Sequence, residues 1–295
     1  MTDILSSALV IMTPLLFAAA GGLFTELSGR LNIALEGQLL TGAFFAILAA
    51  HHTGSLAAGV AAAILAATAM SALVAFAGLK LRSNIFIVGL AANLLAGGLT
   101  VVLSQHFFGT RGVVVLRDLG SLPTLTLPVI DRIPVVGSLL SGHTVYVYLL
   151  WFLLFVSWLV IFRTPFGYRL RACAGHSDAL TSLGIRTNVY RWSAFLVSGF
   201  FCGIGGSLLS LHLGAFVPNM TAGRGWIALV VIFLGLRKPA GLFAAAFVFG
   251  LAEALSNYVQ GFDLPADLVL AMPYLLTLFA MIFVSVLAKR KSSVM

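Results

Sequence analysis

Long apolar runs recur along the whole chain and are separated by short polar connections. A helix of about 20 apolar residues can cross a bilayer, and it satisfies the backbone hydrogen bonds that lipid cannot satisfy. The pattern therefore predicts an all-α polytopic membrane protein with about nine transmembrane helices (eight to ten), forming one domain over residues 1–295. The expected spans are residues 5–24, 32–50, 55–79, 84–104, 145–162, 191–213, 226–236, 240–258 and 269–288.

The run 226–236 is too short to cross a hydrocarbon core of about 30 Å at 1.5 Å per residue. One limb of a broken helix would explain its length and would change the count of spans. A Gly- and Asn-containing approach precedes this run (Gly214…Asn219) and also the run 32–50 (Gly22…Asn32). Paired interruptions of this kind are typical of transporters built from inverted repeats, so we expect broken or re-entrant segments at both places.

The basic residues lie in short loops beside the apolar runs, which is the positive-inside pattern. The loops 25–31, 80–83, 163–191 and 237–239 and the tail after residue 288 hold 13 of the 17 Lys and Arg residues. This distribution places these segments and the C-terminus in the cytoplasm and, with nine spans, the N-terminus outside. The composition is 60% hydrophobic and 9% charged, with a mean hydropathy of +1.08, which excludes an ordinary soluble domain.

The segment 105–143 is the longest region on the outer side in this orientation. It contains Pro123, Pro128 and Pro134 together with apolar turns, so it is too apolar for a flexible linker. We expect short helices that lie at the outer interface or dip into it.

The loop 163–191 is a polar island between two apolar runs. Ser177 is a candidate N-cap, Asp178 suits the first turn of a helix, and Gly184 is a candidate stop. A helix of about two turns is too short to be stable alone, so it has to pack on something. The loop is therefore either a coupling helix that docks on a cytoplasmic ATPase or a solvated loop that obeys the positive-inside rule.

Polar residues near or inside the apolar runs are the candidates for a solute pathway, because intramembrane polar groups have to face protein or a cavity. Glu36 either lines the path or has a structural role, such as capping or pairing with Arg30. Arg224, which this orientation places at the outer mouth, either meets a ligand or solute-binding protein or fixes a turn. The full set of candidates is Asn32, Glu36, Asn93, Asn219, Arg224, Trp226 and Glu253.

Several short motifs resemble the ABC importer permeases of the ribose/branched-chain-amino-acid class, and the nearer similarity is to nucleoside-type permeases. The motifs are residues 164–172 (TPFGYRLRA) with 182–185 (SLGI), 31–37 (LNIALEG), 219–229 (NMTAGRGWIAL), and the outer segment 127–130 (LPVI) with 134–137 (PVVG). They occur in family order between about Gly22 and Leu287. One departure is the turn at Leu236-Arg237, near which the family usually has a Gly-Gly pair.

The resemblance implies a permease subunit of a bacterial importer in the cytoplasmic (inner) membrane, most similar to those that take up nucleosides by ATP-driven alternating access. The implied partners are a cytoplasmic ABC ATPase, a second homologous permease, and an extracytoplasmic binding lipoprotein or periplasmic protein. The residues expected to couple to the ATPase are Gly167, Arg169, Arg171, Ala172, Gly175, Ser177, Asp178, Ala179, Leu183 and Gly184.

Other functions remain open at this point. The chain has no P-loop, so ATP is expected to bind a partner subunit, and no metal or other cofactor is expected. A simple-sugar permease is the alternative within the same class. A proton-coupled carrier that uses Glu36 or Glu253 is a second alternative, and a membrane enzyme is a third, although no nucleophile–base arrangement is visible.

Overall fold

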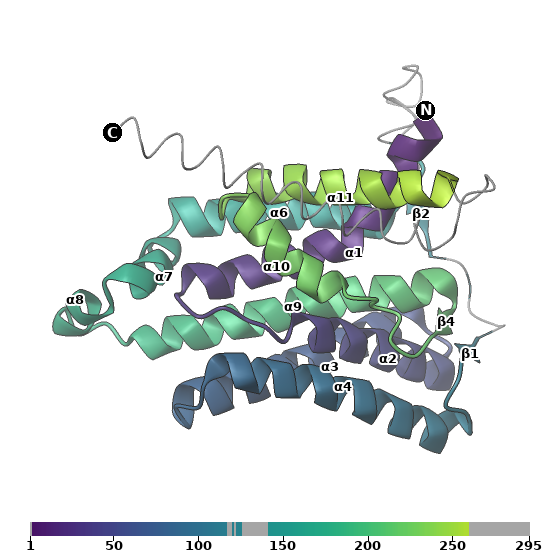
Figure 1. The fold of residues 1–295 in the computed structure, drawn as a ribbon, viewed down its shortest axis with the longest axis horizontal. Coiled ribbons are helices and arrows are strands. Elements are labelled where there is room, and N and C mark those ends of the chain that lie inside the picture. Colours follow the sequence, from purple (N-terminus) through teal and green to yellow (C-terminus); the bar gives the residue numbers. More distant parts are fainter. Residues whose placement is uncertain (1, 117–119, 121, 126–140, 260–295) are drawn as a thin grey trace.

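A computed structural model describes residues 2–116, 120, 122–125 and 141–259 of the chain. These residues form a layered bundle of helices (Figure 1). The helices are α1 (Thr2–Leu27), α2 (Leu35–Thr53), α3 (Leu56–Ala75) continued by the π-helix η1 (Phe76–Lys80), α4 (Ile85–Phe108), α6 (Val145–Arg163), α7 (Pro165–Gly175), α8 (Ser177–Ser182), α9 (Thr187–Leu213), α10 (Arg224–Leu234) and α11 (Pro239–Val259).

Six helices of the described part are long and apolar enough to cross a membrane: α1, α3 with η1, α4, α6, α9 and α11. Helix α2 occupies a predicted span but carries Glu36 and Gln38 in its first turns, and α10 has only 11 residues. The expected count of nine spans is therefore not confirmed, and the predicted span 269–288 lies outside the described residues.

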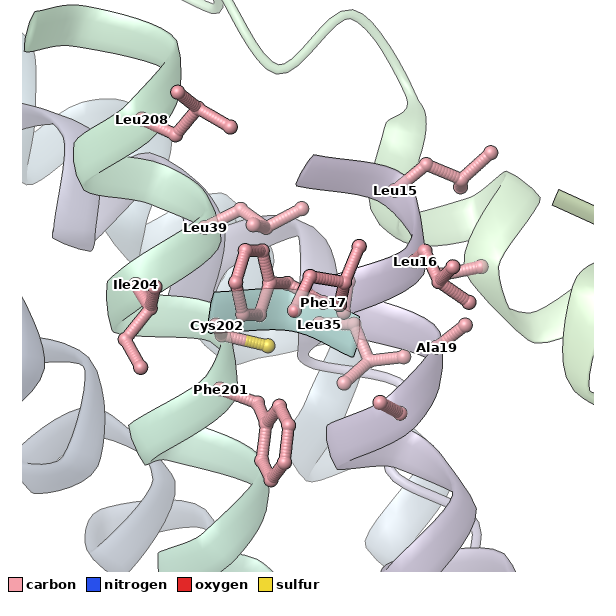
Figure 2. Close-up of a cluster of buried hydrophobic side chains, with 14 of the residues drawn as sticks. Leu15, Leu16, Phe17, Ala19, Leu35, Leu39, Phe201, Cys202, Ile204 and Leu208 are labelled. Atoms are coloured by element: carbon pink, nitrogen blue, oxygen red, sulfur yellow. The ribbon is translucent and has the colours of Figure 1, made fainter. Parts of the chain in front are cut away.

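The core is formed where α1, α2 and α9 meet. Figure 2 shows Phe17 of α1, Leu39 of α2 and Cys202 of α9 converging in one fully buried apolar cluster. Helix α9 also packs closely on α3, because a Cβ at Gly199 would lie 2.5 Å from the Cα of Thr68, and one at Gly203 would lie 2.5 Å from the Cα of Ile64. The Gly-x-x-x-Gly pattern therefore brings two helix backbones together, as such patterns do in membranes.

The predicted basic loops gather at one end of the bundle. The side chain of Arg237, after α10, forms an ion pair of 2.8 Å with Glu26 of α1. Arg191 of α9 donates to the carbonyl of Ser28, just after α1. Helices α7 and α8 project at the same end (Figure 1). The grouping of loops expected from their charge is thus observed for 25–31, 80–83, 163–191 and 237–239; the tail after 288 lies outside the described residues.

The opposite end carries short strands. Strand β1 (Val114–Val115) pairs with β4 (Ala215–Phe216), and β2 (Thr124–Leu125) pairs with β3 (His143–Thr144), both antiparallel. The described residues of 105–143 after α4 are therefore extended or irregular, and most of the stretch in which we expected interfacial helices lies outside the described residues. Residues 117–119, 121 and 126–140 lie outside the description.

The turn between α10 and α11 adopts a conformation that favours glycine. Leu236 and Arg237 both have positive φ, at 53° and 56°, where the resemblance led us to expect a Gly-Gly pair nearby. A left-handed conformation costs roughly 1–2 kcal/mol per non-glycine residue. The ion pair of Arg237 with Glu26 and its stacking over the Phe233 ring at 5.7 Å offset part of that cost.

Two interruptions, the segment 28–34 and the segment between β4 and α10, turn the chain back into the bundle from opposite ends. Ser28 lies beside Arg191, but Asn32 already reaches Ser198 near the middle of α9, so the segment 28–34 runs back from the basic end. Helix α2 then starts in the interior and runs toward the strands. The segment after β4 returns from the strand end, and α10 starts at Glu36 and runs to the basic end. The two short interruptions therefore have opposite directions, as in inverted repeats.

Candidate functional site

The two interruptions meet at the carboxylate of Glu36, which lies in the first turn of α2. Its Oε1 accepts hydrogen bonds from the hydroxyl of Thr221 and from the backbone N–H of Gly223 at 2.9 Å. Its Oε2 accepts the backbone N–H of Gly225 at 2.6 Å. The N–H groups at a helix start have no partner within the helix and carry partial positive charge. Glu36 therefore caps α10 while it belongs to α2.

Close backbone approach makes this contact possible. A Cβ at Gly225 would overlap the backbone N and Cα of Glu36, so the starts of α2 and α10 touch directly. The turn before α10 has three residues in the left-handed region: Asn219 at φ 59°, Ala222 at 47° and Gly223 at 82°. This compact turn aims the N–H groups of Gly223 and Gly225 at one carboxylate.

Arg224 extends the site toward α11. Its Nη2 atom lies 2.6 Å from Oε1 of Glu253, and its Nη1 donates to the carbonyls of Met220 and Thr221. The two side chains of the ion pair are 20% and 33% exposed. Arg224 therefore joins α10 to α11 beside Glu36, at the start of a helix that begins inside the bundle. The short run 226–236 could not reveal the depth at which its helix begins.

Amide side chains tie the start of α2 to two longer helices. Asn32 donates from Nδ2 to Gln38 at 3.1 Å and to Ser198 of α9 at 2.9 Å. Asn93, near the middle of α4, accepts the N–H of Gly37 at 2.8 Å and donates to the carbonyl of Ile33 at 2.9 Å. Both asparagines thus satisfy backbone or side-chain groups that the interruption would otherwise leave unpaired.

The structure brings together five of the seven predicted pathway residues in this polar cluster, namely Asn32, Glu36, Asn93, Arg224 and Glu253. Asn219 and Trp226 flank it at the turn and start of α10 and are exposed, with Trp226 at 40%. Glu36 does not pair with Arg30; its partners are the Thr221 hydroxyl and the start of α10. Of the two structural roles expected for Glu36, capping is observed, at the start of α10, and pairing with Arg30 is not.

Sequence reasoning missed Gln38, Ser198 and Thr221, which complete the cluster. All three are fully buried polar residues. Each stands within or next to an apolar run, which was the one signal available, and buried polar groups in a membrane protein need partners. Among the described residues, no group of three or more His, Cys, Asp or Glu side chains could hold a metal ion.

The polar loop contains two helices, α7 and α8. The missed helix α7 begins at a clear signal: the hydroxyl of Thr164 accepts the N–H of Gly167, and Pro165 occupies the first turn. For α8 the N-cap is His176, so the prediction that Ser177 caps this helix is wrong; Ser177 is its first residue. Asp178 lies in the first turn as expected.

The predicted stop of α8 is confirmed. Gly184 has φ 74°, and the N–H of Ile185 donates to the carbonyl of Leu180 at 2.9 Å, which closes the helix end. Leu180 is buried, whereas Leu183 is 75% exposed.

The predicted coupling residues divide into two groups. Gly167, Arg169 and Arg171 hold α7 in place: Gly167 packs against the carbonyls that end α6, Arg169 donates to the Tyr190 hydroxyl at 3.0 Å, and Arg171 lies 4.8 Å from the Phe162 ring centre. Ala172 is half-buried beside them. The residues Gly175, Asp178, Ala179, Leu183 and Gly184 are exposed, and Ser177 is half-buried at the junction.

Helix α7 also contacts the first interruption directly. A Cβ at Gly29, which has φ 77°, would lie 2.7 Å from the Cα of Ala174. Arg191 donates to the carbonyl of Cys173 at 3.1 Å and to that of Ser28. The segment 28–34 therefore links the polar loop at one end with Asn32 and Glu36 at the other.

Known proteins resemble this chain in sequence and in fold. Residues 4–284 match the family described as "Branched-chain amino acid transport system / permease component". The chain is 32% identical over 290 residues to the guanosine ABC transporter permease protein NupQ of Bacillus subtilis, covering 94% of this chain and 90% of that one. It is 31% identical over 269 residues to a protein of Haloferax volcanii described as a glucose ABC transporter permease, TsgC13, covering 90% of this chain and 80% of that one.

Among solved structures, the fold is similar to a chain described as an inward-facing conformation of a metal-chelate type ABC transporter. The TM-score is 0.54 at 16% identity, and the match covers 95% of this chain and 85% of that chain. The family match and the structural match both extend over nearly the whole chain. The chain therefore belongs to the permease family of branched-chain amino acid transport systems and is a permease subunit of an ABC transporter.

Proposed function

We propose that this importer permease takes up nucleosides, with the polar cluster at Glu36 and Arg224 next to the solute path. The charges of the cluster are internally compensated, because Glu36 accepts three hydrogen bonds at the start of α10 and Arg224 pairs with Glu253. A charged solute inside a membrane needs an opposite charge to compensate it. The cluster offers no charge left over for that purpose, which favours a neutral solute.

The observation that carries the nucleoside proposal is the exposed Trp226, which directly follows Gly225, whose N–H binds Glu36. It stands at the start of α10 with 40% of its surface exposed, and the exposed Asn219 lies in the turn before it. An aromatic face provides a stacking platform for a base, and neighbouring amides provide hydrogen bonds. The similarity to a guanosine permease supports a base-containing solute, while the similarity to a glucose permease keeps a simple sugar as the second candidate.

The test is uptake by cells in which this gene is deleted and then restored as wild type or variant. We expect labelled guanosine to be taken up and unlabelled nucleosides, but not glucose or ribose, to compete. Stacking on a base is worth about 1–3 kcal/mol, so Trp226→Ala should raise the KM for guanosine by about 5- to 150-fold, and Trp226→Phe by much less. Phe233→Ala, another exposed aromatic of α10, is the matched control. If glucose competed and nucleosides did not, the proposed solute would be a simple sugar instead of a nucleoside.

The partners follow from the same proposal. A cytoplasmic ATPase docks on the exposed residues of α8 and the end of α7, a second permease completes the pore, and an extracytoplasmic binding protein delivers the solute. In a bacterial cell membrane, the basic end of the bundle faces the cytoplasm, so the N-terminus faces outward and the C-terminus inward. ATP binds the partner subunit, and this chain has no ATPase site of its own.

Movement of α7 and α8 reaches the solute path through the segment 28–34. Gly29 touches Ala174, and Asn32 and Glu36 hold the starts of α2 and α10. Nucleotide-driven closure of the ATPase thereby rocks the two short helices around the cluster. A proton-coupled carrier would instead drive uptake into vesicles with a proton gradient and no ATPase, and robust uptake there would overturn the ATP-driven mechanism.

A further inference from the structure

A separate small cavity lies at the basic end of the bundle, away from the polar cluster. Its volume is about 290 Å³, near the lower end of the range for small-ligand sites, and it is lined by Arg30, Gly78, Leu79, Arg82, Ser83 and Asn188. Three separate segments supply these residues: the interruption 28–34, the π-helix with its following turn, and the first turn of α9. Four of the six are charged or polar, so the cavity is built for a polar ligand.

The charge in and around this cavity is positive and uncompensated. The ion pairs of the described residues are Arg224 with Glu253 and Arg237 with Glu26, so neither Arg30 nor Arg82 has a carboxylate partner there. The Nε atom of Arg30 is buried and has no hydrogen-bond partner. Arg191 lies close enough to Arg30 for the two guanidinium charges to repel each other. Clustered like charges are costly, and an anion in the cavity would compensate them.

The backbone around the cavity is specialised as well. The helix α3 ends in the π-helix η1, and the N–H of Ser83 reaches back to the carbonyl of Ala77. Arg82 adopts a left-handed conformation at φ 55°, which is rare for a non-glycine residue. Strained residues and π-helical turns concentrate at functional sites. The start of α9 adds the positive end of a 27-residue helix at Asn188.

We propose that this cavity binds a phosphate group, supplied either by the headgroup of an anionic lipid or by free phosphate. Guanidinium groups match phosphate oxygens in geometry and charge, and basic pockets between transmembrane helices bind lipid headgroups. The occupant bridges the guanidinium groups of Arg30 and Arg82. Asn32 follows Arg30 by two residues. Asn93 lies on α4, which follows the turn at Arg82, and Ser198 lies on α9, as Asn188 does. Binding therefore holds together the three elements that carry the polar cluster.

The experiment uses the purified full chain in a neutral detergent. Phosphatidylglycerol, phosphatidylcholine and inorganic phosphate are added separately, and the melting temperature and the lipid retained in native mass spectra are measured. We expect phosphatidylglycerol to raise the melting temperature and phosphatidylcholine to leave it unchanged. If inorganic phosphate alone gives the same rise, the ligand is the free ion; if only phosphatidylglycerol does, it is the lipid headgroup.

Variants locate the effect. Arg82→Gln should reduce the rise in melting temperature at least by half. Asn188→Asp should abolish it, because the new carboxylate repels the anion while an acid at a helix start stabilises α9. Lys80→Gln removes a nearby exposed charge that does not line the cavity, so it should keep the full rise. Equal responses to the two lipids with no response to phosphate, or equal losses in Lys80→Gln and Arg82→Gln, would overturn the proposal.

Discussion

The carboxylate of Glu36 accepts the backbone N–H of Gly225 at 2.6 Å, although the two residues stand 189 positions apart in the sequence. The contact joins the first turns of two helices that start inside the bundle and run in opposite directions. A single acid thus satisfies backbone groups that a helix start leaves open. This relationship holds the two interruptions of the chain together.

Replacing Glu36 by Gln tests that contact. The amide keeps the shape but loses the charge and one acceptor, so an N–H at the start of α10 is left unpaired. We expect the free energy of unfolding to fall by about 1–3 kcal/mol. Asp178→Asn, which removes an exposed carboxylate at the start of α8, is the control and should change the melting curve little. Equal effects of the two substitutions would mean that Glu36 does not hold α10.

The Arg224–Glu253 ion pair is tested by a double-mutant cycle. Arg224→Gln and Glu253→Gln each leave one charge without its partner between α10 and α11, whereas the double variant leaves none. We expect each single variant to lose stability and transport, and the double variant to lose less than the sum. The coupling energy should be about 0.5–3 kcal/mol, since the pair is partly buried. Strictly additive effects would show that the two side chains act independently.

Gly29→Ala tests the link between the polar loop and the cluster. The new methyl group would meet the Cα of Ala174 at 2.7 Å, so α7 has to move away from the segment 28–34. Gly54→Ala is a matched control, because Gly54 also has positive φ, at 67°, and no atom within 4 Å of the new methyl group. We expect both variants to carry similar backbone strain and only Gly29→Ala to uncouple ATP hydrolysis from solute uptake. A comparable loss of coupling in both would attribute the effect to backbone strain alone.

The exposed edge of α8 should decide ATPase binding. Leu183 is 75% exposed, so Leu183→Asp should leave the melting temperature unchanged and abolish co-purification of the ATPase. Gly175→Trp, at an equally open position, should act in the same way. Leu180 is buried, and Leu180→Asp should instead destabilise α8 itself. Normal recovery of the ATPase with Leu183→Asp would place the docking surface elsewhere.

Cys173 can report the position of α7. Its side chain, on α7, is buried. Burial raises the pKa of the thiol, and the nearby Arg191 offsets this rise only in part. A raised pKa leaves less thiolate near neutral pH, so labelling of a Cys202→Ala chain by a maleimide should be much slower than in denaturant. Displacing α7 by Gly29→Ala should speed it. Rapid labelling of the folded chain without that substitution would contradict the buried position.

Local patterns predicted the parts of the molecule that depend on local physics. Apolar run length predicted the approximate span positions within the described residues, and basic residues predicted which loops share one end. Gly184 was recognisable as a stop because its left-handed conformation favours glycine. The Thr164-Pro165 start of α7 was present in the sequence but was overlooked.

The remaining features depend on contacts between distant parts of the chain. The contact of Arg224 with Glu253 on α11 could not be predicted, because a run of apolar residues does not reveal where its helix begins in the bundle. The partners of Glu36 are mainly backbone N–H groups, which every residue carries, so no side-chain pattern could point to them. Asn93 was left undecided for the same reason: it binds the backbone of Ile33 and Gly37.

The spacing of Glu36 and its partners has a consequence for the synthesis of the protein. Glu36 enters the membrane 187 residues before Gly223 exists, which at about 5–20 residues per second is about 10–40 s. During that time α2 carries an acid that nothing in the nascent chain can cap. The carboxylate of Glu36 therefore acquires these partners only after the turn before α10 has been made, and a chain that stops before Thr221 lacks all three of them.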